Sequence, residues 1–301
     1  MYDLIIIGAG PAGITASVYA ARKKMNFLVV TGDIGGQAAW SGDIENYTGY
    51  QFITGPELAI KFEEHMRKYN IPVKEKEEAK EIKKTGDLIT VRSAKATYEA
   101  RSVIIASGKK SRELGVPGEK EFKNKGLTYC ATCDGPLFSG KDVAVVGGGN
   151  SALDAALQLI KIAKQVYIIN NTAALGGDPL MRDKIVNAEN ASVLNSANIT
   201  SILGDKMVSA VKIIQDGKES QLAVEGIFVE IGLIPNSGFA HDVEKNQVGE
   251  IKVNCNNETN IPGIFAAGDV TDVPEKQIII AAGEGAKASL GAFKYLVSNK
   301  F

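Results

Sequence analysis

Two glycine-rich turns constrain the fold of this 301-residue chain more than any other feature. The first, GAGPAG at residues 8–13, follows an apolar run typical of a buried strand and precedes ITASVYAARK, which is typical of a helix. FLVV then predicts a second strand, and in this context the GxGxxG spacing predicts a dinucleotide-binding fold. Gly8 makes the tight turn, Gly10 lets the backbone approach a pyrophosphate, and Gly13 lets the helix pack on the strand. The helix start then offers free N–H groups to the phosphates.

The second turn repeats this pattern. A predicted strand at 142–147 leads to Gly147, Gly149 and Ala152, and a predicted helix and a strand at 166–169 follow. Ala152 stands at the third glycine position, where the motif tolerates alanine. Two such copies predict an α/β chain with two Rossmann-like dinucleotide-binding domains of the FAD/NAD(P) type, each a three-layer ββα unit. ITVRSAKATYEA and AVKIIQDGKESQLAVEG have the pattern of hairpins that cover the two folds.

Charge and hydropathy exclude several classes of function. Lys and Arg (34) nearly cancel Asp and Glu (35), so the charge predicts binding to neither nucleic acid nor a membrane. No apolar run reaches the roughly 18 residues that span a bilayer. The N-terminal residues have the pattern of a buried strand rather than of a basic leader, so we expect no signal peptide and a cytoplasmic protein.

The three cysteines are too few for a disulfide framework. Neither His65 nor His241 lies at a zinc-motif spacing from Cys130 and Cys133, so we expect no metal site. The CxxC spacing favours a redox pair instead, because it closes a small, reducible ring at a helix start that stabilises the thiolate. A pair of small buried side chains is the structural alternative. Cys255 lies in a polar stretch and is expected to take no part.

Two aspartates stand beside these motifs. Asp134 follows the cysteine pair directly, so it can move the proton of a thiol–disulfide exchange or cap a helix. Gly268 and Asp269 end the predicted strand in IPGIFAAGDV. The Asp269 carboxylate can accept hydrogen bonds from the polyol of a ligand or cap a helix.

Five blocks resemble the low-molecular-weight thioredoxin reductases and, as closely, the flavoprotein subunit of bacterial alkyl hydroperoxide reductase. They run in order from residue 8 to residue 292: GAGPAG, GGQAAWSGDIENY, YCATCDGPLF, VAVVGGGNSALDAA, and IPGIFAAGDV with KQIIIAAGEGAKASLGA. CATC followed by Asp, just before a second glycine motif, is highly specific. CDGPLF and KQIIIAAGEGAKASL lean toward the hydroperoxide reductase branch. The length favours an independent thioredoxin reductase, because the extra N-terminal domains of the other branch are absent.

The resemblance implies an FAD-binding domain built from residues 1–112 and 243–301, with a second domain, 113–242, inserted between them. Thr31 stands where many dinucleotide folds have an acid, a departure this family shares. The final helix would open at Gln277, and its N-terminal dipole can stabilise negative charge on a reduced flavin. The implied FAD contacts are Gly8, Gly10, Pro11, Ala12, Gly13, Thr31, Gly36, Gln37, Asn46, Gly108, Gly268, Asp269, Gln277, Ile278 and Ala281.

The resemblance also implies roles for the redox pair. Cys133 would be the sulfur next to the flavin, Cys130 the thiolate that attacks the partner's disulfide, and Asp134 the acid–base. The inserted domain would rotate between flavin and partner, with hinges near 115–118 and 240–246. The implied partner is thioredoxin or a thioredoxin-like protein, and the implied oligomer is a homodimer.

The electron donor is left open by the second nucleotide fold. NADPH-dependent members of the family carry a His-Arg-Arg sequence where this chain has Asn170, Asn171 and Thr172. The 2′-phosphate is normally met by Arg, and only Arg182, further along, could reach back. NADH-preferring relatives would have an acid at Asn170. A nicotinamide cofactor is therefore uncertain.

Three donors remain open for this chain. Gly147, Gly149, Asn150 and Ser151 could form a vestigial nicotinamide site that binds NADH weakly. A subgroup that lacks the nicotinamide motifs takes electrons from reduced ferredoxin. NADPH is the least favoured of the three.

The favoured function is therefore an FAD-dependent thioredoxin-disulfide reductase. One alternative is the reductase component of a peroxidase system. Another is a flavin-based redox sensor or electron carrier that does not turn over thioredoxin.

Overall fold

The computed structural model describes residues 1–41, 43, 44 and 46–299. The chain forms two compact units, one made of Met1–Lys110 with Ile234–Phe301 and the other of Ser111–Leu233. The second unit is thus inserted into the first in sequence. Each unit is built on its own sheet and its own hydrophobic core.

The chain returns to the first unit at Ile234, ahead of the expected boundary at residue 243. The backbone N–H of Asn236 donates to Gly108 O at 2.9 Å, and Ala240 is buried in the core of the first unit. These contacts attach the segment that follows Ile234 to the first unit. The two crossing segments, β9 (Lys109–Ser111) and β18 (Leu233–Pro235), pair as a two-stranded sheet.

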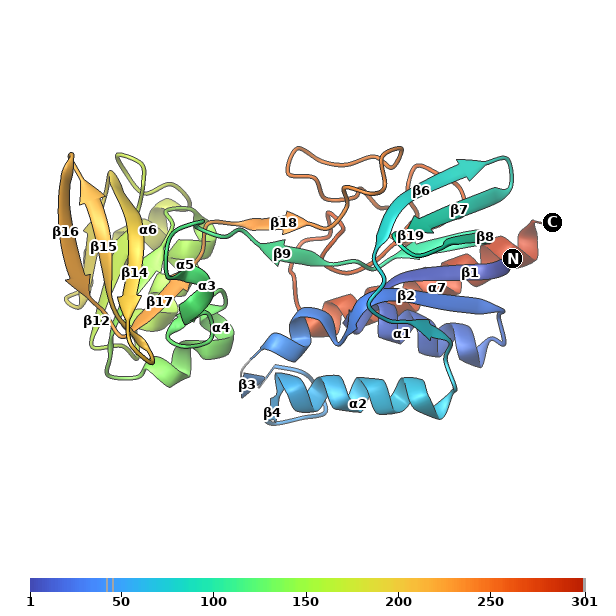
Figure 1. Ribbon diagram of the computed structural model, residues 1–301, viewed down its shortest axis with the longest axis horizontal. Helices are drawn as coiled ribbons and strands as arrows, with labels where there is room; N and C mark the ends of the chain where they lie inside the picture. Colours follow the sequence, from blue (N-terminus) through green and yellow to red (C-terminus); the bar gives the residue numbers. More distant parts are fainter. Residues whose placement is uncertain (42, 45, 300–301) are drawn as a thin grey trace. The chain divides into compact units, whose positions relative to one another are not determined.

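A seven-stranded sheet forms the centre of the first unit, in the order β5-β2-β1-β8-β7-β6, with β19 also paired to β8 (Figure 1). β1 pairs in parallel with β2 and β8, whereas β7 is antiparallel to β6 and β8, so the expected hairpin over residues 89–100 is present. The strands are β1 (Tyr2–Ala9), β2 (Phe27–Ile34), β5 (Val73–Lys74), β6 (Ala79–Thr85), β7 (Leu88–Ser93), β8 (Thr97–Ile105) and β19 (Ile264–Ala266). A separate pair is formed by β3 (Asp43–Ile44) and β4 (Ile53–Thr54).

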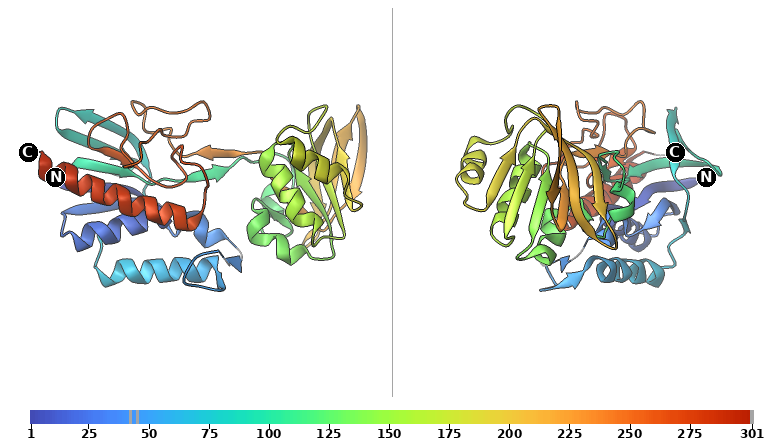
Figure 2. Two further views of the ribbon diagram at one scale, coloured as in Figure 1. Left: turned by 180° about the vertical axis from the view of Figure 1, so that it is seen from behind. Right: turned by 60° about the vertical axis from the view of Figure 1, so that its left-hand side comes forward.

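The helices of the first unit are α1 (Pro11–Arg22), α2 (Gly55–Lys68), α7 (Ile278–Ser298) and the short 3-10 helix η1 (Gly36–Trp40). α1 and α7 lie side by side (Figures 1 and 2). Their backbones approach closely, because a Cβ on Gly285 would stand 2.0 Å from Ala12 O. Small residues on both helices therefore let the starts of α1 and α7 come together.

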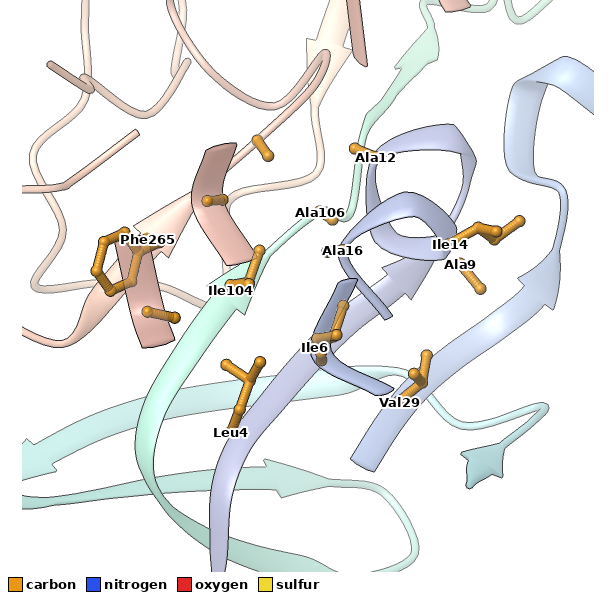
Figure 3. Packing of buried hydrophobic residues seen from close by; sticks show 14 of the residues in the cluster. Leu4, Ile6, Ala9, Ala12, Ile14, Ala16, Val29, Ile104, Ala106 and Phe265 are labelled. Atoms are coloured by element: carbon orange, nitrogen blue, oxygen red, sulfur yellow. The ribbon is translucent and has the colours of Figure 1, made fainter. Parts of the chain in front are cut away.

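Both faces of β1 are buried, as its continuous apolar run predicts. Leu4 and Ile6 lie in a cluster with Ile104, Ala12 and Ala16, which Figure 3 shows. The alternate residues of the strand lie in a second cluster beneath the β6–β7–β8 hairpins. The sheet is thus enclosed on both sides, and its carboxyl edge is left to carry a site.

The second unit has three layers (Figure 1). A five-stranded parallel sheet, β10-β17-β11-β12-β13, is covered on one face by α5 and on the other by the antiparallel sheet β14-β15-β16, which contains the expected hairpin at 210–226. The strands are β10 (Leu127–Thr128), β11 (Asp142–Val146), β12 (Gln165–Ile169), β13 (Ala191–Leu194), β14 (Ala197–Gly204), β15 (Val208–Gln215), β16 (Lys218–Ala223) and β17 (Gly226–Val229). The helices are α3 (Glu119–Phe122), α4 (Ala131–Asp134), α5 (Asn150–Ile160), α6 (Pro179–Val186) and the 3-10 helix η2 (Gly135–Phe138). The predicted fold class is confirmed.

Among the described residues, none of the helices is long and apolar enough to cross a membrane. In the same part of the chain, no three His, Cys, Asp or Glu side chains gather as a metal ion would require.

Candidate active site

The first glycine turn joins β1 to α1, and its three glycines have different surroundings. A Cβ on Gly8 would lie 2.3 Å from Ala106 O, and a Cβ on Gly13 would lie 1.9 Å from Gly8 O. These two glycines are required by packing. Gly10 is open, because the nearest atom to its Cβ position is Gly36 Cα at 4.0 Å. The backbone at Gly10 can therefore be approached by a ligand.

Two helices begin at this edge of the sheet without a side-chain cap from any described residue. Gly10 is the N-cap of α1 and Gln277 is the N-cap of α7. Neither helix has an acidic residue in its first turn, so their N-terminal N–H groups and positive dipole ends are available to an anion. Asn46 Nδ2 donates to Gln277 Oε1 at 3.1 Å, which brings two predicted FAD residues together.

The remaining predicted FAD residues lie around the same edge, with two differences in detail. Thr31 is buried, and its hydroxyl accepts from Ala9 N at 3.1 Å and donates to Asp33 O, so it closes the ends of β1 and β2. Asp269 begins no helix, since α7 starts nine residues later at Ile278, so the capping alternative does not apply. Gly36, Gln37, Gly108, Gly268 and Ala281 also lie here, and Ile278 packs against the small cluster around Leu58.

Sequence reasoning missed Glu284 in α7, which holds the Gly268 turn. Its side chain is 4% exposed, and Oε2 accepts from Gly268 N at 2.8 Å. Burial raises the pKa of Glu284, although that hydrogen bond opposes the rise. The signal that could have identified Glu284 is an acidic residue on the buried face of a helix rich in small residues.

Sequence reasoning also missed Lys109, which follows Gly108. Its side chain is 8% exposed, and Nζ lies 3.5 Å from Asp269 Oδ2. Its carbonyl oxygen accepts a hydrogen bond from Gln37 Nε2. Burial lowers the pKa of Lys109, and the Asp269 carboxylate opposes that fall. A buried cation is thus part of this site.

These features fit FAD. A glycine turn that is open only at Gly10 and two uncapped helix starts suit the pyrophosphate of a dinucleotide. Asp269, Asn46 and Gln277 supply polar groups around the same edge, as a ligand with ribityl and ribose hydroxyls requires. The predicted FAD residues thus gather at one edge of the sheet, and Lys109 lies among them.

The predicted redox pair lies at α4 of the second unit. Cys130 is disulfide-bonded and stands directly before the helix, whereas Cys255 is free and exposed. Cys133 belongs to α4, but its side chain lies outside the described part of the structure. Asp134 N donates to Cys130 O at 3.1 Å, which closes the turn.

Thr128 joins the ends of this turn, and the sequence did not single it out. Its hydroxyl donates to Asp134 Oδ2 and accepts from Cys130 N at 3.2 Å. Asp134 does not cap η2 with its side chain, so its carboxylate is directed to Thr128 rather than to a helix start. The acid–base candidate is thus tied to the cysteine it would serve.

A buried carboxylate, Glu119, supports the same segment and was also missed. It is 2% exposed and accepts three hydrogen bonds, from Leu114 N and Gly115 N at 2.7 Å and from Tyr129 Oη at 2.9 Å. Burial and this hydrogen bond raise the pKa of Tyr129 well above its usual range. Glu119 therefore links the predicted hinge at Gly115 to the residue before Cys130.

The second glycine turn keeps its phosphate-binding form. Gly147 has a φ of 137°, and a Cβ there would lie 2.4 Å from Glu230 O. Gly149 is the N-cap of α5 and has open space at its Cβ position. Ser151 is exposed, but Asn150 Oδ1 already accepts from Asp178 N at 2.8 Å. The start of α5 is thus open at Gly149, while Asn150 is hydrogen-bonded to the neighbouring loop.

Asn170, at the position expected to bind the ribose of a nicotinamide cofactor, is by contrast enclosed. Asn170 is 1% exposed, and its Nδ2 donates to Thr172 O at 3.0 Å and to Asn195 Oδ1 at 2.8 Å. Its Oδ1 accepts from Thr172 N at 3.3 Å and lies 2.9 Å from Thr172 Oγ1. The Asn170 amide is therefore saturated within the chain. Arg182 Nη1 donates to Leu175 O at 3.2 Å.

Known proteins resemble this chain over nearly all of its length. Residues 2–285 match the family described as pyridine nucleotide-disulphide oxidoreductase. A protein named NADH dehydrogenase from Ferdinandcohnia aciditolerans is 42% identical over 99% of this chain and 58% of its own length. An alkyl hydroperoxide reductase subunit from Staphylococcus aureus is 42% identical over 99% of this chain and 60% of its own. The thioredoxin reductase structure from Streptococcus pyogenes has 39% identity and a TM-score of 0.88, with 99% of both chains covered.

The fold and the site define the class of flavoprotein oxidoreductases with FAD as cofactor. The chain belongs to the pyridine nucleotide-disulphide oxidoreductase family, and the resemblance drawn from its sequence is confirmed. It spans about three fifths of the length of the curated relatives named above.

Proposed function

We propose that the protein is an FAD-dependent reductase of the disulfide in a thioredoxin-like protein. The observation that carries the proposal is Cys130, disulfide-bonded at the start of α4 and tied through Thr128 to Asp134. A thiol at a helix start is poised to form the thiolate, which is the attacking species in disulfide exchange. The similarity to thioredoxin reductase from S. pyogenes supports the same partner class.

Bound FAD would supply the two electrons that open the Cys130–Cys133 disulfide. Cys130 then attacks one sulfur of the partner's disulfide as the thiolate, forms a mixed disulfide and releases the other partner sulfur as a thiolate. Cys133 next attacks Cys130 Sγ as a thiolate and releases the second partner sulfur, so the Cys130–Cys133 disulfide is restored. The partner has gained two electrons and takes up two protons.

Asp134 moves a proton in this sequence. The Thr128 hydroxyl orients the Asp134 carboxylate and also receives the backbone N–H of Cys130, so acid and nucleophile share one hydroxyl. We propose that Asp134 protonates a departing partner thiolate and then takes up a new proton from solvent, to which it is partly exposed.

The electrons enter from NADH or reduced ferredoxin rather than from NADPH. The buried and saturated Asn170 offers nothing to a 2′-phosphate, and Asn171 and Thr172 supply no charge. The open start of α5 supports NADH, as does the similarity to a protein named NADH dehydrogenase. Anaerobic titration with NADH, NADPH and reduced ferredoxin, followed by flavin bleaching, separates the donors. Rapid stoichiometric bleaching by NADPH would contradict the assignment.

A second candidate is supported by the similarity to the alkyl hydroperoxide reductase subunit from S. aureus. In this case the reduced Cys130 would pass its electrons to the disulfide of a peroxidase component. The chemistry at Cys130 is the same, and only the partner differs. We expect the protein to act as a cytoplasmic homodimer in either case, and light scattering of the pure holoenzyme tests its mass.

The decisive test replaces Cys130 with Ser in the holoenzyme, with Cys255→Ser as the matched control. The Cys130 variant should lose reduction of thioredoxin and of a peroxidase disulfide, while its flavin is still bleached by the donor. The Cys255 variant should match the parent. Undiminished thioredoxin reduction by the Cys130 variant would refute the proposal. If the donor bleaches the flavin of the parent enzyme but the enzyme reduces no protein disulfide, the redox-sensor function would be favoured instead.

A further inference from the structure

Lys109 stands among residues assigned to FAD, yet neither the glycine motifs nor the redox chemistry requires a lysine there. It follows Gly108, its carbonyl accepts from Gln37 Nε2, and its Nζ lies 3.5 Å from Asp269 Oδ2. All three neighbours belong to the predicted FAD set. The side chain is buried, whereas the next residue, Lys110, is exposed.

A buried lysine is costly, and an ion pair does not repay that cost by itself. Removing an ammonium group from water opposes its charge, which is why burial lowers the pKa of Lys109. Apolar residues of similar size often replace a buried ion pair without loss of stability. The Lys109–Asp269 pair is therefore poorly explained as a stabilising contact of the fold.

A second lysine close by is committed elsewhere. Lys276 Nζ lies 3.1 Å from Glu250 Oε1 and donates to Thr271 O, so it neutralises Glu250 and fixes the loop before α7. Among the described residues, the lysine that forms an ion pair with Asp269 is thus Lys109. Without it, the Asp269 carboxylate would stand as an uncompensated negative charge at the carboxyl edge of the sheet.

We propose that Lys109 is a positioning residue of the FAD site, which holds the Asp269 carboxylate and offsets its charge against the anionic cofactor. FAD carries a negative pyrophosphate, and a reduced flavin gains further negative charge. Asp269 is useful as an acceptor for hydroxyl groups but repels both of these charges. Lys109 keeps the acceptor and removes the repulsion. The proposal rests on FAD binding and not on the identity of the disulfide partner.

The test compares Lys109→Met with Lys110→Met, which removes the same charge from the adjacent exposed position. Apoprotein is titrated with FAD, and the flavin midpoint potential of the holoprotein is measured by spectroelectrochemistry. Lys109→Met should weaken FAD binding about 10-fold and lower the flavin potential, because an unpaired carboxylate opposes both the cofactor and its reduction. Lys110→Met should change neither value.

A charge-pair cycle keeps the test decisive if Lys109→Met folds poorly. Lys109→Arg retains the cation and should keep a flavin potential close to that of the parent. In the background of Asp269→Asn, the buried lysine loses the carboxylate that favours its charged form, so replacing Lys109 with Met should lower the potential much less. A purely structural lysine would not give this difference. Unchanged FAD affinity and potential in Lys109→Met, or an equal fall in potential with and without Asp269, would overturn the proposal.

The same measurements in a Cys130→Ser background separate this proposal from the proposed function. A shift in potential that persists there supports Lys109 whatever the partner is. Its absence there counts against Lys109 alone.

Discussion

Glu119→Gln is expected to release the segment that enters the second unit. In the parent, Oε1 accepts from Leu114 N and Tyr129 Oη, and Oε2 accepts from Gly115 N. A glutamine keeps the first pair only if its oxygen takes the Oε1 position. Its NH₂ group then faces Gly115 N–H, so two donors meet and that hydrogen bond is lost.

The cost follows from the number and kind of these bonds. Hydrogen bonds to a charged acceptor contribute about 1.5–3 kcal/mol each, against about 1 kcal/mol for a neutral one. Gly115 is exposed, so water can partly replace the lost hydrogen bond. Losing the bond to Gly115 therefore costs about 1–2 kcal/mol. Weakening the bonds from Leu114 and Tyr129 adds a similar amount, so local opening should become easier by about 3 kcal/mol.

Hydrogen exchange is the suitable assay, because a chain with two units need not unfold in one step. Peptides that cover residues 112–118 should exchange about 100-fold faster in Glu119→Gln than in the parent. Glu121→Gln removes the same charge from an exposed position of α3 and is the matched control. Equal exchange in both variants would refute the assignment of Glu119 as the group that holds Leu114 and Gly115.

Three further outcomes are expected. Gly13→Ala should abolish the folded FAD unit, measured by loss of bound flavin, because its Cβ would stand 1.9 Å from Gly8 O. Burial raises the pKa of Glu284 above its ordinary 4.5, so ionisation of this carboxyl destabilises the fold as the pH rises above 4.5. Glu284→Gln should therefore be more stable to heat than the parent at pH 8 but not at pH 4. Thr128→Val should slow thioredoxin reduction about 10-fold, through a displaced Asp134, without slowing flavin bleaching in stopped flow.

The sequence was sufficient to predict elements whose signal is local. The glycine turns, the buried first strand and the hairpin over residues 89–100 depend on neighbours a few positions apart, and all three are present. Most of the predicted FAD residues follow a strand or lie near the start of a helix, so their gathering at one edge of the sheet is also a local expectation. The return to the first unit at Ile234 was placed late, because it depends on backbone pairing with residue 108, far away in sequence.

The polar groups that were missed share a different cause. Glu119, Glu284 and Lys109 are ordinary residue types in ordinary local sequence, and each gains its role from partners brought to it by the fold. Charge counts treat such residues as surface, since buried Glu and Lys are rare. Only the three-dimensional contacts show that these groups are buried, with hydrogen bonds to Glu119 and Glu284 and an ion pair at Lys109.

Asn170 shows why residue type alone could not decide the donor. From the sequence, an asparagine in place of the usual acid could still bind ribose hydroxyls. In the structure both Nδ2 hydrogens are donated and Oδ1 is occupied, and Oδ1 would lie 2.2 Å from a Cβ on Gly148. A ligand that used Asn170 would first have to break contacts that hold the loop after β12. The proposal that this site binds a nicotinamide weakly therefore rests on how the asparagine is bound within the chain as well as on the charge it lacks.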